Sequence, residues 1–172
     1  MASLMENLIE TLDCENKEYQ TLIGLSREKT PVIIEGNLDK LAEITGKEQL
    51  IVEKIQSLEK NRIQHMKDIA EVTNTDFDTL NLAALIDMMK GRQKEQTALM
   101  KLHDELKTTM RDMQAVNNQN RELLKSSLEM VEFEMNLINS MRRAPETADY
   151  NKNAYNTGSI MGSGTKRFDS KS

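Results

Sequence analysis

Apolar residues recur every three or four positions along most of this chain, which is the spacing of helices that bury one face. The first such stretch begins near Ser3 and is predicted to pass through Pro31 to Glu35, where Gly36 closes it in a left-handed turn. Because proline lacks a backbone donor, we expect a kink before Pro31. The alternative is a separate short turn capped by Thr30.

A second helix is predicted from Asn37, which can cap it, to about Val72. Its seam follows a seven-residue repeat, in which Glu48 and Arg62 are expected to set the register. The alternative is that these two residues lie at the exposed edge of the seam. The seam residues are Leu41, Ile44, Glu48, Ile51, Ile55, Leu58, Arg62, His65, Ile69 and Val72. Residues 73–79 have the composition of a turn.

A third helix is predicted from Thr79–Asn81 to Arg142–Arg143, with Pro145 ending it. Gly91 is a weak point, and the alternative is that residues 81–90 fold back there. Three helices joined by short turns predict an all-α, elongated, antiparallel three-helix coiled-coil bundle over residues 1–143, with a long third helix. Residues 144–172 are predicted to form a flexible polar tail with isolated apolar residues, among them Tyr150 and Tyr155.

The end of the third helix, residues 117–141, is apolar on too many sides for one partner. Its apolar residues cover an arc of roughly 220° at about 100° per residue, whereas a helix on a single core needs somewhat more than 100°. At about 1.5 Å per residue, this helix should also outrun the second one near residue 117. The predicted partner-binding residues are Leu123, Leu124, Leu128, Val131, Phe133, Met135, Ile138 and Met141. The alternative is that a homodimer or the chain's own helices bury them.

The composition excludes several functional classes. The chain has 172 residues, a net charge of −5 and no basic patch with interleaved aromatics, so nucleic acid is not an expected partner. We expect neither a membrane span nor a signal peptide, and the single Cys14 fits a reducing, cytoplasmic compartment.

The usual signatures of catalysis are missing from the sequence. It contains no glycine-rich phosphate loop, no cysteine pair and no histidine–glutamate cluster. His65 falls on the seam of the second helix, where a structural role is expected rather than ligand binding. We therefore expect no enzyme, no cofactor and no metal site.

Residues 1–143 resemble the FlgN-type flagellar export chaperones. The resemblance rests on four stretches in order, which are LIGLSREKTPVIIEGNLDKL (22–41), EQLIVEKIQSLEKNR (48–62), NNQNRELLKSSLEMVEFEMNLI (117–138) and YNTGS (155–159). Pro31 and the length of the tail depart from what is expected of every member.

The resemblance implies a bacterial cytoplasmic chaperone of flagellum biogenesis that is not an enzyme. Such a protein would bind hook–filament junction proteins, keep them from assembling prematurely and deliver them to the flagellar type III export apparatus. The family's client-binding region maps onto Asn117 to Met141, and the tail, with Tyr150 and Tyr155, would dock on the export apparatus. The alternatives are a self-assembling structural coiled coil and an adaptor whose tail docks another protein.

Overall fold

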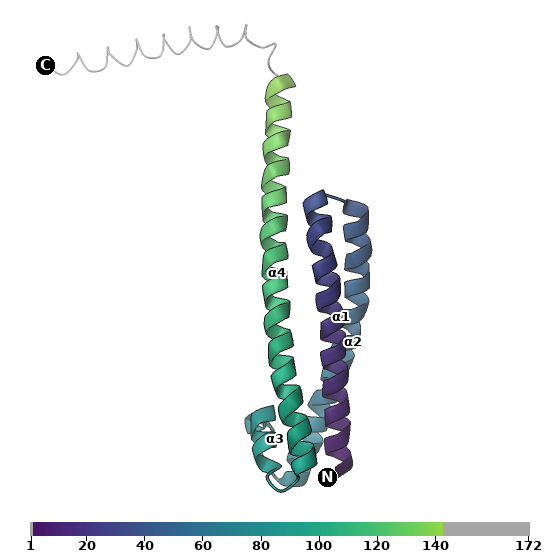
Figure 1. The fold of residues 1–172 in the computed structure, drawn as a ribbon, viewed down its shortest axis with the longest axis vertical. Coiled ribbons are helices and arrows are strands. Elements are labelled where there is room, and N and C mark those ends of the chain that lie inside the picture. The colour runs from purple at the N-terminus through teal and green to yellow at the C-terminus, as the bar shows by residue number, and fades with distance from the viewer. Residues whose placement is uncertain (1, 143–172) are drawn as a thin grey trace, which may run out of the picture. The chain divides into compact units, whose positions relative to one another are not determined.

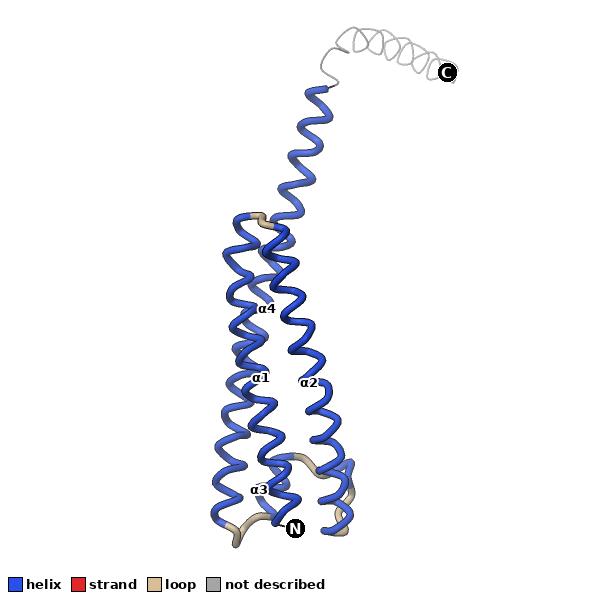
Figure 2. The backbone as a smooth tube through the Cα atoms, turned by 90° about the vertical axis from the view of Figure 1, so that its right-hand side faces the viewer, coloured by secondary structure: helices blue, strands red, loops and turns tan. Residues whose placement is uncertain are grey.

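The computed structural model describes residues 2–142, and this part of the chain contains helices and turns but no strand (Figures 1 and 2). Its elements are α1 (Ala2–Glu35), α2 (Leu38–Thr73), the 3-10 turn η1 (Phe77–Thr79), α3 (Leu82–Met88) and α4 (Gln93–Arg142). The chain divides into two units, the first ending at Ser127 and the second beginning at Leu128. The tail residues 144–172 lie outside the described part, so the predicted boundary at 143/144 stays a prediction.

The described chain is all-helical, as the sequence predicts, but it has four α-helices rather than three. Gly91 has φ +117°, a conformation that side-chain-bearing residues rarely adopt, and it separates α3 from α4. The single third helix starting near residue 80 is therefore wrong, and the alternative of a break at Gly91 holds. The coiled-coil packing of the long helices stays a prediction.

The other helix ends agree with the local sequence. α1 passes through Pro31 and ends at Glu35, after which Gly36 has φ +69°. The amide of Gly36 donates to the carbonyl of Ile33 and that of Asn37 to the carbonyl of Val32, which together form a Schellman turn. The side chain of Asn37 then accepts from the amide of Lys40 at 3.1 Å and caps α2.

In the first unit, α1 and α2 lie side by side, and α3 sits beside the first turns of α4 (Figure 1). The main apolar cluster lies at this end of the unit, where the start of α1 meets the end of α2, α3 and the start of α4. It consists of Met5, Leu8, Leu12, Met66, Ile69, Ala70, Leu80, Leu85, Met89, Leu99 and Leu102. Burial of this apolar surface is the main source of stability for these elements.

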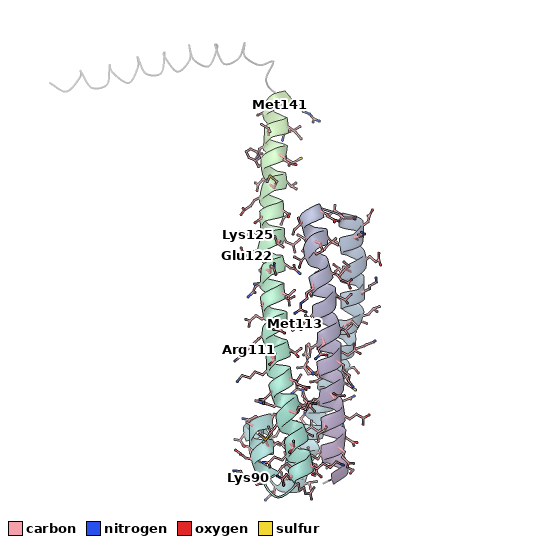
Figure 3. All side chains as sticks on the ribbon, viewed as in Figure 1. Lys90, Arg111, Met113, Glu122, Lys125 and Met141 are labelled. Carbon is pink, nitrogen blue, oxygen red and sulfur yellow. The ribbon has the colours of Figure 1, made fainter. Side chains whose placement is uncertain are left out.

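Farther along α4, the residues buried against the unit are polar. Beyond Leu102, only Thr109 and Asn120 of α4 are buried. The hydroxyl of Thr109 donates to Asn16 of α1 at 2.8 Å. Asn120 accepts from the hydroxyl of Thr30 and donates to the carbonyl of Ser26, both at 2.7 Å. Met113, labelled on α4 in Figure 3, lies between Thr109 and Asn120 in the sequence and is half-buried.

The same stretches of α1 make polar contacts with α2. Glu48 accepts hydrogen bonds from Ser26 at 2.9 Å and Lys29 at 2.7 Å. Arg62 donates to Glu15 at 3.1 Å; burial raises the pKa of Glu15, and the charge of Arg62 acts in the opposite direction. The seam positions Glu48 and Arg62 are thus paired across the α1–α2 contact, although their effect on register stays a prediction.

The predicted α2 seam is wrong at its C-terminal end. Val72 is 57% exposed, whereas Met66 and Ala70 are buried instead. The buried residues Ile44, Ile55 and Met66 are eleven positions apart. An eleven-residue repeat stays on one face of a nearly straight helix, while a seven-residue repeat drifts by about 20° per repeat.

Replacing Gly91 with alanine should lower the free energy of unfolding by about 1 kcal/mol or more, because a Cβ is strained at positive φ. Gly46→Ala is the matched control, since Gly46 lies inside α2 with open space around it and should gain about 0.5–1 kcal/mol. Urea unfolding followed by circular dichroism measures both. Equal effects of the same sign would contradict the left-handed turn.

Asn120→Ala should lower the free energy of unfolding by about 1–3 kcal/mol, because it removes one buried and one partly buried hydrogen bond between α4 and α1. Asn117 is exposed one turn earlier, so Asn117→Ala should stay within about 0.5 kcal/mol of the parent. The same unfolding measurement compares them. If the two variants match, the Asn120 contact does not stabilise the fold.

Candidate partner-binding surface

No group of three or more histidine, cysteine or acidic side chains is placed to hold a metal ion in the described part of the chain. His65 is half-buried and lines a small cavity of about 250 Å³ with Cys14 and Glu10. The Nδ1 atom of His103 lies 3.4 Å from a carboxylate oxygen of the exposed Asp104.

No helix of the described chain is both long enough and apolar enough to cross a bilayer.

The last turns of α4 carry a dense set of exposed apolar side chains. Between Leu128 and Arg142, the large apolar residues are exposed by 47% (Ile138) to 70% (Leu128). Met141, labelled at the end of α4 in Figure 3, is 67% exposed. A contiguous apolar surface of this kind marks an interaction site more often than a solvated face.

Most of the predicted partner-binding residues are therefore accessible. Leu128, Val131, Phe133, Met135, Ile138 and Met141 are exposed, Leu124 is 37% exposed and Leu123 is half-buried. The accessible surface also begins later than residue 117, because Asn120 is buried against α1. Its role in binding stays a prediction.

Met130 and Leu137 are exposed on the same segment and belong to this surface, although they were not among the predicted binding residues. The sequence could have revealed both residues, because they lie on the same wide apolar arc of residues 117–141. Tyr150 and Tyr155, the predicted docking residues of the tail, lie outside the described residues.

Two grooves in the first unit were not predicted. One, of about 690 Å³, lies between α1 and α2 over Leu25, Leu50 and Ile51. The other, of about 470 Å³, lies between α1 and α4 over Ile9 and Leu102. The sequence did not reveal these grooves, because each is marked only by a single apolar residue beside a helix seam, such as Leu50 beside Ile51.

The charges on the exposed segment are mainly negative. Residues 128–142 contain Glu129, Glu132 and Glu134 against a single base, Arg142. Glu134 lies within the apolar arc, whereas Glu129 and Glu132 lie on the polar side. A partner with basic residues beside its apolar contacts would complement this surface.

Comparison with known proteins gives three findings. Residues 1–157 match the family model described as FlgN protein. The uncharacterized protein YvyG of Bacillus subtilis (strain 168) is 25% identical over 120 residues, which cover 70% of this chain and 71% of that protein. No solved structure gave a significant match.

Proposed function

Because the chain belongs to the FlgN protein family, we propose that it is a flagellar type III export chaperone. In this role it binds hook–filament junction proteins in the bacterial cytoplasm, prevents their premature assembly and delivers them for secretion. It acts by binding, without catalysis and without a cofactor.

The exposed apolar surface on α4 is the observation that carries this proposal. A chaperone that keeps a client unassembled must cover apolar client surface with apolar surface of its own. Each large side chain that becomes fully buried on binding can contribute on the order of 1–3 kcal/mol. Several such side chains lie close together between Leu128 and Met141.

Helix-on-helix packing is the binding mode that this surface favours. The described chain offers an apolar helix face and no strand edge that could receive an extended peptide. The client would then supply amphipathic helices, or a segment that folds into a helix on binding.

A self-assembling coiled coil is the alternative, because the same apolar surface could pair with a second copy. Sedimentation equilibrium of the purified chain separates the two functions. A stable oligomer that hides Leu128–Met141 would support self-assembly, whereas a monomer that captures a junction protein would support the chaperone.

Replacing Leu124, Leu128, Val131 and Met135 together with serine should weaken client binding more than a hundredfold, since four anchors of about 1–3 kcal/mol each are lost. All four side chains are exposed, so the helix content should be unchanged. Isothermal titration calorimetry with a purified hook–filament junction protein measures affinity, and circular dichroism measures helix content.

The matched control replaces four residues on the polar side of the same turns, Glu129, Glu132, Asn136 and Asn139, with serine. Its client affinity should stay within a few-fold of the parent. Unfolding of the apolar variant would instead place its four residues in the protein's own core.

The tail is proposed to be a second, separable docking element for the export apparatus, with Tyr155 or Tyr150 as its anchor. Deleting residues 146–172 should leave client affinity within a few-fold but impair secretion of the client and swimming motility. Calorimetry and a motility assay measure these two effects. Loss of client binding on deletion would assign the tail to the client site.

A further inference from the structure

The exposed apolar side chains of α4 form two rows rather than one. At about 100° per residue, the centres of the two rows are roughly 135° apart around the helix. The first row is Leu128, Val131, Met135 and Ile138, and the second row is Met130, Phe133, Leu137 and Met141. All eight side chains are exposed, so both rows are open to a partner.

Glu134 lies between the two rows and is itself exposed. By the same helical geometry, it is about 80° from the centre of the first row and 55° from that of the second. A single partner helix centred on the apolar arc would cover Glu134. Its carboxylate would then be buried without a partner on this helix, which is costly.

Two partner helices, one on each row, avoid this cost. Packed helices have axes about 8–10 Å apart. Two helices docked in directions roughly 135° apart would therefore have axes about 17 Å from each other, too far to touch. The gap between them lies over Glu134, where water or a basic side chain can reach its carboxylate.

A second copy of this chain fits the surface less well. Residues 128–142 carry three acids and one base, a net charge of −2, and the whole chain carries −5. Pairing two copies in parallel and in register across the arc would bring the two Glu134 carboxylates together in an apolar contact, which is unfavourable. A partner with basic residues beside its apolar face is favoured instead.

We infer that the client holds the end of α4 with two amphipathic helices, one packed on each row, with Glu134 in the gap between them. This inference rests on the proposed function and adds to it the number and placement of the client's helices. The client must then offer two apolar helix faces at once, with lysine or arginine near the gap.

Site-specific cross-linking tests the two-helix arrangement. In a Cys14→Ser background, Met135→Cys labels the first row and Leu137→Cys labels the second, about 160° away around the helix. Each full-length variant is modified with benzophenone maleimide, bound to a purified hook–filament junction protein and irradiated, and the cross-linked peptides are mapped by mass spectrometry. Asn136→Cys, on the polar side, is the matched control.

The two row positions should cross-link to two different helical segments of the client, and the control should give at least tenfold less product. Cross-links from both rows to the same client segment would overturn the inference. So would a cross-link from either row to a second copy of this chain.

Substitution of Glu134 gives a second, independent measurement. Glu134→Leu should leave client affinity unchanged or weaken it, because its side chain faces a gap filled by water or a basic client side chain rather than by a partner helix. Glu132→Leu, on the polar side, matches the change in charge and size. If Glu134→Leu tightens binding more than fivefold relative to Glu132→Leu, a single helix covers the arc and the inference is wrong.

The two hypotheses fail in different ways. If the parent chain captures no hook–filament junction protein, the proposed function fails and the inference with it. If the parent chain captures one but both rows contact the same segment, only the two-helix arrangement fails.

Discussion

The contacts that hold α4 against the other helices of the first unit are apolar at the start of α4 and polar farther along it. The position of α4 depends on this difference. At its start, Leu99 and Leu102 are buried in the main apolar cluster. Beyond them, the buried residues are Thr109 and Asn120, each held by directed hydrogen bonds to α1. Apolar contacts tolerate sliding, whereas a buried amide or hydroxyl must meet its partner or lose free energy. The apolar end therefore supplies stability, and the polar contacts supply position.

The buried polar residues do not weaken the fold, because each of them has a hydrogen-bond partner. No buried side-chain nitrogen or oxygen in residues 2–142 lacks a hydrogen-bond partner. α1 carries most of the pairing, because Glu15 and Ser26 contact α2 while Asn16 and Thr30 contact α4. A helix with polar partners on two sides is specified by both of them, and replacing one buried partner leaves the other unsatisfied.

Much of the fold could be predicted from local sequence, because helix ends depend on a few residues with strong conformational preferences. Gly36 and Asn37 marked the α1–α2 turn correctly. Gly91 left two alternatives open, since a glycine can interrupt a helix or lie within one, as Gly46 does. The exposure of Val72 could not be predicted, because small departures from a seven-residue repeat accumulate over a long helix. For the candidate site, the wide apolar arc was visible in the sequence, but its start was not, because Asn120 resembles a solvent-facing residue until its partners on α1 are known.

The contact of Asn120 with Ser26 and Thr30 also fixes the position of α4 along α1. Sliding α4 by one heptad would move it about 10 Å along its axis and separate the amide of Asn120 from both partners. Such a slip would also change how many apolar side chains of α4 stay exposed, because they recur every three or four residues. If α4 binds a client as proposed, the number of apolar residues available to that client would depend on the contact of one buried amide with α1. Substitution of Asn120 or its partners would then change the length of the exposed apolar surface of α4 without changing any residue of that surface.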